Sequence, residues 1–153
     1  MTSILFVCLG NICRSPMAEF VFRDLVQKRG LGDRFHIASA ATSAEELGNP
    51  VHPGTRRRLA QEGISTAGKT AVQLTRRDYG RYDLLIGMEQ RNLSAMLRIL
   101  GGDPQGKVRR LLDFTGSPRD ISDPWYTGDF DRTYDDVWEG CLGLLEYLEA
   151  ESR

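Results

Sequence analysis

Residues 4–15, with the sequence ILFVCLGNICRS, constrain the fold most strongly because three kinds of local structure meet there. The apolar run over residues 3–7 is typical of a strand buried on both faces in a parallel sheet. Five residues separate Cys8 from Arg14, and Ser15-Pro16 then supplies a good N-cap and a good first helical residue. This stretch therefore predicts a strand, a tight loop and a helix N-terminus in succession.

The rest of the chain alternates between the spacings typical of helices and of strands. The first helix has an apolar stripe over 17–25 and ends at Gly30. Further strands are predicted at 35–40, 83–88 and 108–112, helices at 55–62, 89–100 and 130–149, and irregular segments at 41–53 and 114–128. This order predicts an α/β fold, a doubly wound parallel sheet in a single domain over residues 1–153. Right-handed crossovers would bring the carboxyl ends of the strands, and the loop after Cys8, to one edge.

Composition limits the classes of function. The chain has 153 residues, of which 41% are hydrophobic and 27% charged, and a net charge of −1, so it lacks the basic character of a general nucleic-acid binder. No apolar run approaches membrane-spanning length or resembles a signal peptide. The cysteines number three, which does not suggest a set of paired disulfides, and His36 and His52 belong to no metal-ligand cluster. We therefore expect a cytoplasmic protein with no bound metal, no nucleic-acid partner and no membrane association.

The loop after the first strand has the composition of an anion site with a nucleophile at its edge. Its backbone N–H groups and the following helix dipole converge on one point, and Arg14 can add a bidentate pair to an oxyanion. The same positive surroundings favour a thiolate at Cys8, toward which Ser15 can donate its hydroxyl. Gly10 permits a backbone conformation with positive φ, and Asn11 tolerates the left-handed conformation and can brace the loop with its amide.

Cleavage of a phosphate ester would also need a carboxylic acid to protonate the leaving oxygen. Asp123 is the best candidate because Trp125 and Tyr126 follow it and offer apolar walls to an aromatic leaving group. An Asp-Pro pair by itself more often marks a turn, and Asp120 and Asp129 lie nearby. Residue spacing alone does not choose among the three aspartates.

The loop closely resembles the signature of the low-molecular-weight protein tyrosine phosphatases. The resemblance begins with VCLGNICRSPMAE at residues 7–19 and extends through SAATS at 39–43, GNP at 48–50, YDL at 82–84 and DPWY at 123–126. It therefore covers essentially the whole chain. It implies a four-stranded parallel sheet flanked by helices on both faces, no cofactor, phosphotyrosine-containing proteins as substrates and phosphate as a product. We also expect a monomer.

The resemblance assigns roles to individual residues. It implies that Cys8 is the nucleophile, Arg14 the clamp on the transition state, and Asp123 the general acid and then the general base. Ser15 resembles the residue that stabilises the thiolate. Ser39 and Lys69 are expected to support the loop, together with Asn11. The residues expected to contact the substrate are Leu9, Gly10, Asn11, Ile12, Cys13, Ser15, Glu45, Trp125 and Tyr126.

Three positions depart from the family pattern. Glu45 replaces an aromatic residue that many members carry beside the cleft, so one wall should be more polar and acidic. Lys69 stands where a loop-bracing histidine is often found, and Glu89 where an aspartate follows the third strand. We expect these last two to affect the rigidity of the loop more than the chemistry.

Cys13 lies inside the loop and has two interpretations. It packs the loop, or it acts as a resolving thiol that forms a disulfide with an oxidised Cys8, as the resemblance implies. Cys141 falls on the apolar stripe of the last helix and is expected in the core.

Two rival functions stay open. A thiol-dependent arsenate reductase shares the fold but needs further cysteines after the third strand, and none occurs between Cys13 and Cys141. An inactive domain that only binds phosphorylated partners would usually lack the nucleophile or the acid, whereas Cys8, Arg14 and Asp123 are all present.

Overall fold

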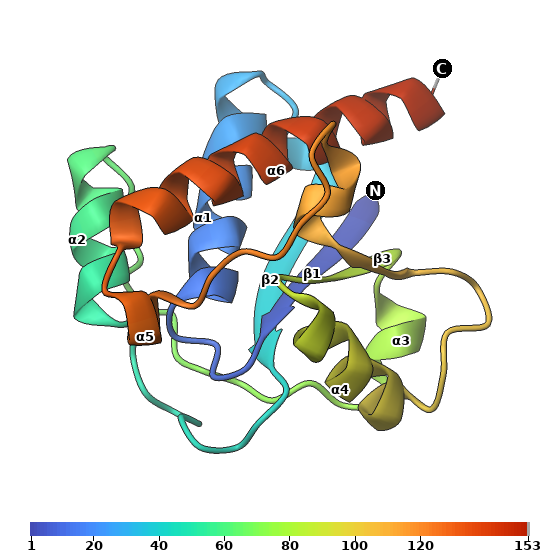
Figure 1. Ribbon diagram of the computed structural model, residues 1–153. Coiled ribbons are helices and arrows are strands. Elements are labelled where there is room, and N and C mark those ends of the chain that lie inside the picture. The colour runs from blue at the N-terminus through green and yellow to red at the C-terminus, as the bar shows by residue number, and fades with distance from the viewer. Residues whose placement is uncertain (153) are drawn as a thin grey trace.

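The computed structural model describes residues 1–152 and is built around a sheet of four parallel strands (Figure 1). The strands are β1 (Thr2–Cys8), β2 (Phe35–Ala41), β3 (Leu84–Gly87) and β4 (Val108–Arg110). Their order across the sheet is β2-β1-β3-β4, and each neighbouring pair is parallel. This arrangement confirms the predicted doubly wound α/β fold.

Helices cover both faces of the sheet. The long helices α1 and α6 pack against each other on one face, while α4 packs against β3 and β4 on the other (Figure 1). The helices are α1 (Arg14–Lys28), α2 (Pro53–Gln61), α3 (Asp78–Arg81), α4 (Gln90–Leu100), α5 (Pro124–Thr127) and α6 (Phe130–Glu151), with 3₁₀ turns η1 (Gly32–Arg34) and η2 (Leu111–Phe114). Within residues 1–152, none of these helices combines the length and the apolar character needed to cross a membrane.

Strand β1 divides the core between the two faces, which explains its continuous apolar sequence. Ile4 and Phe6 belong to the larger cluster with α1 and α6, whereas Leu5 and Val7 belong to the cluster with α4. All four are nearly inaccessible to solvent. Alternate side chains of a strand point to opposite faces, so a central strand between two helical layers must be apolar at every position.

Helix α6 lies close to η2 because glycines face it at the contact. A Cβ atom built on Gly140 would lie 2.5 Å from Leu111 Cγ, and one built on Gly143 would lie 2.3 Å from the Phe114 carbonyl oxygen. The apolar stripe predicted for this helix is largely buried. Trp138, which helical spacing also places on this stripe, is 38% exposed, whereas Leu144 is fully buried.

Several element boundaries differ from the sequence prediction. Helix α1 begins at Arg14 with Cys13 as its N-cap, so Ser15 and Pro16 lie inside the first turn. Ser15 does not cap the helix because its hydroxyl is bonded to the loop instead. Strand β4 ends at Arg110, where η2 takes over, and α3 and α5 are single turns that the sequence pattern missed. Such short elements carry too few residues for a periodic signal.

The strand order places the Cys8 loop at the point where the sheet topology reverses. The chain passes from β1 to β2 on one side and continues through β3 on the other. In open α/β sheets, the crevice at the carboxyl ends of the strands beside such a switch point is where ligands bind. Cys8 ends β1, and Glu89 follows β3 at the same edge.

Candidate active site

The Cys8 thiol lies at the carboxyl end of β1, beneath the first turn of α1. Its sulfur is 3.0 Å from Ser15 Oγ and accepts a hydrogen bond from the Ser15 backbone N–H at 3.4 Å. A sulfur at a helix N-terminus with two donors aimed at it is placed to carry a negative charge. These contacts agree with the expectation that Ser15 stabilises a thiolate.

Asn11 holds the shape of the loop from behind. It adopts the left-handed conformation with φ of 58°, whereas Gly10, which permits positive φ, does not use it. From this conformation the Asn11 amide nitrogen donates to Ser15 Oγ at 2.8 Å and to Ser39 Oγ at 2.9 Å. Its amide oxygen accepts from the Val72 N–H at 3.1 Å. A buried amide with all three bonds formed fixes the loop relative to β2.

A second layer of polar residues supports Asn11. Ser39, at the carboxyl-terminal half of β2, donates its hydroxyl to Glu19 Oε1 at 2.5 Å. Lys69 donates to the Ser39 carbonyl oxygen at 2.9 Å and lies 3.9 Å from Glu19 Oε1. Burial lowers the pKa of Lys69 below its ordinary value, although the Glu19 carboxylate opposes that shift. Ser39 and Lys69 therefore lie where loop support was expected, behind the loop rather than at the cavity.

Arg14 is almost fully buried, and its guanidinium points toward the carboxyl ends of the strands. One terminal nitrogen donates to Glu89 Oε2 at 2.5 Å and to the Ile121 carbonyl oxygen at 2.8 Å, and the other donates to Asp123 Oδ2 at 3.3 Å. Burial disfavours the cation, but the charges of Cys8 and Asp123 and the bond to Glu89 hold the pKa of Arg14 above its ordinary value.

These bonds leave part of the guanidinium available for a ligand. A guanidinium carries five N–H groups, and three of those of Arg14 are used. Within residues 1–152, the Nε–H and one terminal N–H have no protein acceptor. Arginine binds phosphate oxygens best in pairs, so a bidentate contact with an oxyanion remains open to this side chain.

Asp123 faces Arg14 from the start of α5. One of its carboxylate oxygens accepts from the Trp125 backbone N–H at 3.0 Å and so caps the helix, and the other accepts from Arg14. Proline at the first position of α5 favours the helix start and restricts Asp123 to its extended conformation. Trp125 and Tyr126 are 58% and 80% exposed, so their aromatic rings are available to contact a ligand.

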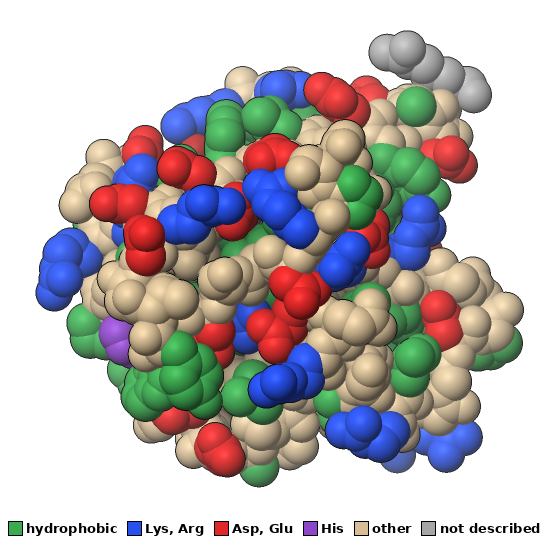
Figure 2. All heavy atoms as spheres, in the orientation of Figure 1, with side chains coloured by type: hydrophobic (Ala, Val, Ile, Leu, Met, Phe, Trp, Pro, Cys, Tyr) green, Lys and Arg blue, Asp and Glu red, His purple; other side chains and the backbone are tan. Residues whose placement is uncertain are grey.

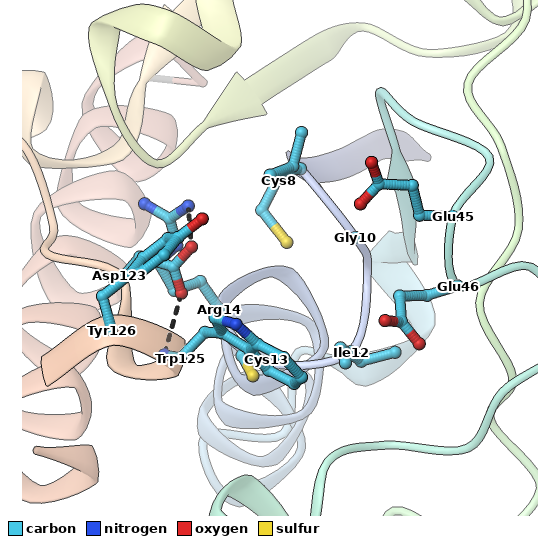
Figure 3. Close-up of a pocket in the computed structure, with 11 residues that line it drawn as sticks. Cys8, Gly10, Ile12, Cys13, Arg14, Glu45, Glu46, Asp123, Trp125 and Tyr126 are labelled. Carbon is cyan, nitrogen blue, oxygen red and sulfur yellow. Dashed lines mark hydrogen bonds and ion pairs between the residues drawn. The ribbon is translucent and has the colours of Figure 1, made fainter. Parts of the chain in front are cut away.

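A cavity of about 120 Å³ lies between these groups (Figure 3). Figure 3 shows the Cys8 sulfur pointing into it, with Arg14 and Asp123 on one side and Glu45 and Glu46 on another. Of the predicted residues, Asn11, Ser15, Ser39 and Lys69 lie behind the loop instead of lining this cavity. The lining residues are Cys8, Leu9, Gly10, Ile12, Cys13, Arg14, Glu45, Glu46, Asp123, Trp125 and Tyr126.

Cys13 lines the same cavity but has a different environment from Cys8. Burial, reinforced by the nearby charges of Cys8 and Asp123, raises the pKa of the Cys13 thiol to about 12. Its carbonyl oxygen accepts a hydrogen bond from Thr55 Oγ1 at 3.2 Å. Cys13 is therefore a neutral thiol at physiological pH.

Sequence reasoning missed two of the side chains at this site. Glu46 was expected near the mouth of the loop with Glu45 but was not assigned a contact with the substrate, although it lines the cavity. Glu89 was expected to affect the rigidity of the loop more than the chemistry, and its direct bond to Arg14 was not foreseen. The two residues are 75 positions apart, and only the parallel pairing of β1 with β3 brings them to one edge.

Comparison with known proteins gives a consistent result. The family model described as low molecular weight phosphotyrosine protein phosphatase matches residues 3–153. The low molecular weight protein-tyrosine-phosphatase YfkJ of Bacillus subtilis is 40% identical, with 100% of this chain and 99% of the relative covered. PtpA of Staphylococcus aureus (strain bovine RF122), which carries the same description, is 34% identical, with 100% and 97% covered.

Solved structures agree with the sequence matches. The crystal structure of YfkJ superimposes with a TM-score of 0.95 at 40% identity, covering 100% of this chain and 98% of that one. A protein tyrosine phosphatase from Entamoeba histolytica, solved with Hepes in its active site, has a TM-score of 0.92 at 26% identity, with both chains fully covered. The match of the family model across almost the whole sequence, together with these relatives, shows that the chain belongs to the low molecular weight protein tyrosine phosphatase family.

Proposed function

We propose that this protein tyrosine phosphatase hydrolyses aryl phosphate monoesters through a phosphocysteine on Cys8, with Arg14 as the clamp and Asp123 as the acid and base. Its family membership makes it a hydrolase and supports phosphotyrosine-containing proteins as its substrates. The observation that carries the residue assignment is the shared cavity, in which the Cys8 sulfur faces Arg14 and Asp123. A nucleophile, an oxyanion clamp and a proton donor are the parts that phosphoryl transfer needs.

In the first step, the Cys8 thiolate attacks phosphorus in line with the phenolic oxygen. A sulfur–phosphorus bond forms while the phosphorus–oxygen bond breaks, and Asp123 gives its proton to the departing oxygen. The free N–H groups of Arg14 and the loop amides hold the three equatorial oxygens. The incoming dianion competes with Asp123 for Arg14, which releases that carboxyl group toward the leaving oxygen.

In the second step, water attacks the phosphocysteine. Asp123 now accepts a proton from this water, the sulfur–phosphorus bond breaks, and phosphate leaves with the thiolate restored. We expect the rate to follow a bell-shaped pH profile with an acidic limb below neutrality.

The assignment of Asp123 can be tested through the leaving group. Cys8→Ser is expected to abolish turnover. Asp123→Asn should lower kcat/KM, which reports only the steps up to departure of the leaving group, about 10²-fold or more for phenyl phosphate, and clearly less for para-nitrophenyl phosphate, whose anion leaves without a proton. Asp129→Asn serves as the matched control and should keep the wild-type ratio between the two substrates. Equal losses on both substrates would rule out Asp123 as the acid, and full activity of Cys8→Ser would rule out the nucleophile.

An assay of arsenate reduction with thioredoxin, run beside the para-nitrophenyl phosphate assay, addresses the rival functions. An arsenate reductase would consume arsenate with thioredoxin and leave para-nitrophenyl phosphate intact. A domain that only binds phosphoproteins would turn over neither compound. The absence of cysteines between Cys13 and Cys141 argues against the first rival, and the presence of both Cys8 and Asp123 at one cavity argues against the second.

We also propose that the Cys8 loop is redox-sensitive. Peroxide would oxidise the Cys8 thiolate to a sulfenic acid, and condensation with the Cys13 thiol would release water and form a disulfide. Both thiols are free in the structure and line one cavity. Cys13→Ser protein should recover less activity with dithiothreitol after peroxide than the wild type. Equal recovery would contradict a protective role.

We further propose that the protein acts as a monomer in the cytoplasm. A reducing compartment keeps cysteines as thiols, and all three cysteines of this chain are free. Gel filtration at micromolar concentration should give the mass of one chain, and cell fractionation should recover the protein with cytoplasmic markers.

A further inference from the structure

A groove of about 770 Å³ continues from the catalytic cavity along α4, and we refer to it as the α4 groove. Leu9, Arg14, Asp123 and Tyr126 line both the cavity and this groove, so a substrate held at Cys8 extends directly into it. Its far side is formed by the exposed face of α4. Nothing in the proposed chemistry uses that face.

The acidic side chains in the α4 groove are all paired with arginines. Glu89 and Asp123 are both paired with Arg14, and Asp120 lies 2.9 Å from Arg110. Asp120 also accepts the Gln90 backbone N–H at the start of α4. Each of these carboxylates therefore has a guanidinium partner, with Arg14 shared between two of them and Arg110 shared between Asp120 and Asp113.

Two arginines in the α4 groove lack such compensation. Arg91 and Arg98 lie seven residues apart, so they occupy one face of the helix, with the small Ser94 and Ala95 between them. Both are exposed, and within residues 1–152 neither forms an ion pair with a carboxylate. Figure 2 shows Lys and Arg side chains gathered at the lower right of this face, over the place where α4 lies in Figure 1.

The wall of the catalytic cavity on the side away from the α4 groove carries negative charge, the reverse of Arg91 and Arg98. Glu45 and Glu46 line it, and neither forms an ion pair among the described residues. The Glu46 carboxylate accepts only the Asn49 amide, at 2.6 Å. A substrate that crosses Cys8 therefore meets carboxylates on one flank and guanidinium groups on the other.

We propose that the α4 groove is a subsite for a carboxylate side chain next to the phosphotyrosine of a protein substrate, held by Arg91 and Arg98. This inference rests on the proposed function, because the phosphotyrosine must occupy the Cys8 cavity. An extended peptide advances about 3.3 Å per residue, so residues near the phosphotyrosine reach along a groove of this size. Glu45 and Glu46 repel the same carboxylate from the other flank, which fixes the direction in which the peptide lies.

The subsite predicts a preference that small substrates do not reveal. Exposed ion pairs contribute modestly, so an acidic residue on the correct side should raise kcat/KM by about three- to tenfold. Salt should reduce the effect, because both arginines are accessible to solvent. The gain should appear on one side of the phosphotyrosine only.

The test compares phosphotyrosine peptides with neutral flanks, with glutamates N-terminal to the phosphotyrosine, and with glutamates C-terminal to it. The enzymes are the wild type, Arg91→Ala/Arg98→Ala, Arg91→Glu/Arg98→Glu, and Arg56→Ala/Arg57→Ala. The last variant removes two exposed, unpaired arginines from α2 and matches the change in net charge. Each peptide rate is divided by the rate for para-nitrophenyl phosphate with the same enzyme, which cancels differences in folded fraction.

The wild type and the α2 control should share the acidic preference, the alanine double variant should lose it, and the glutamate double variant should favour neutral over acidic peptides. Equal rates for acidic and neutral peptides would overturn the subsite while leaving phosphatase activity in place. A preference that survives in the alanine double variant, or that falls equally in the α2 control, would also overturn it. Failure of the wild type to hydrolyse any phosphotyrosine compound would instead refute the proposed function, and the subsite with it.

Discussion

Glu89, the residue after Met88 at the end of β3, accepts a hydrogen bond from Arg14 at 2.5 Å and thereby ties a neighbouring strand end to the start of α1. Arg14 is 2% exposed, and Asp123 is its other carboxylate partner. Glu89 therefore holds the guanidinium in place while leaving Asp123 free to exchange partners. This makes Glu89 a positioning residue.

Replacement of Glu89 should therefore weaken phosphate binding. In Glu89→Ala, Arg14 turns to Asp123 as its remaining carboxylate, so the inhibition constant for inorganic phosphate should rise about tenfold and kcat should fall by a similar factor. Glu89→Asp keeps the charge and should recover much of both values. Glu146→Ala removes an exposed carboxylate of α6 and serves as the control. Phosphate inhibition that is the same in Glu89→Ala and in this control would contradict the role.

Asn11 combines a backbone role with a side-chain role, and two substitutions separate them. Asn11→Gly keeps the left-handed conformation but loses the amide that bonds Ser15 and Ser39. Asn11→Ala loses the amide and also places a Cβ in a conformation that costs about 1–2 kcal/mol. Both should lower kcat by about 10²-fold, because the loop loses its brace.

Urea unfolding then distinguishes the two variants of Asn11. The alanine variant should be less stable than the glycine variant by about 1 kcal/mol, less than the full strain because glycine loses more backbone entropy on folding. Equal stability of the two variants would show that φ at this position is not constrained, and wild-type kcat in either would show that the amide does not brace the loop.

Cys13 should make the fold sensitive to alkaline pH. Its thiol has a pKa of about 12 in the folded protein against 9.0 for an ordinary cysteine. Above pH about 9 the unfolded chain loses this proton while the folded protein keeps it, so the free energy of unfolding falls as pH rises toward 12. The slope from one such group approaches about 1.4 kcal/mol per pH unit.

Cys13→Ala removes this group, so its free energy of unfolding should fall less steeply than that of the wild type between pH about 8 and about 10.5. Urea titrations in the presence of a reductant measure the difference, and Cys141, whose pKa burial also raises, is present in both proteins and cancels. Parallel curves for the two proteins would show that Cys13 titrates normally in the fold.

Glu45 and Glu46, which line the cavity wall away from the α4 groove, should favour peptides with basic residues on that flank of the phosphotyrosine. Glu45→Gln/Glu46→Gln is expected to lower the ratio of kcat/KM for lysine-flanked over neutral phosphotyrosine peptides by about two- to fivefold, because two unpaired carboxylates are lost. The effect should shrink in high salt. Glu146→Gln removes one exposed carboxylate far from the cavity and should leave the ratio unchanged. An unchanged ratio in the double variant would show that these glutamates do not meet the peptide.

The three aspartates near residue 123 show where reasoning from the residues stopped. Spacing could not choose among Asp120, Asp123 and Asp129; the neighbouring Trp125 and Tyr126 made Asp123 the best candidate, and the family resemblance assigned it the role. In the structure, Asp120 pairs with Arg110 and Asp129 caps α6 by accepting the Arg132 N–H at 2.9 Å. Asp123 alone of the three bonds Arg14. The contact that distinguishes Asp123 joins residues more than 100 positions apart, so no local pattern in the sequence indicates it.

The sequence by itself determined the strand–loop–helix unit around Cys8, because burial on two faces, a short loop and a helix start each depend on neighbouring residues. It also determined the alternation that makes the sheet parallel and brings the strand ends to one edge. Tertiary structure decided which groups meet at that edge: Glu89 and Asp123 pair with Arg14, Lys69 bonds the Ser39 carbonyl, and Arg91 and Arg98 have no carboxylate partner among residues 1–152. Ion pairs and hydrogen bonds depend on side chains from distant segments arriving within a few ångströms of each other. That proximity is a property of the packed fold and not of any stretch of the chain.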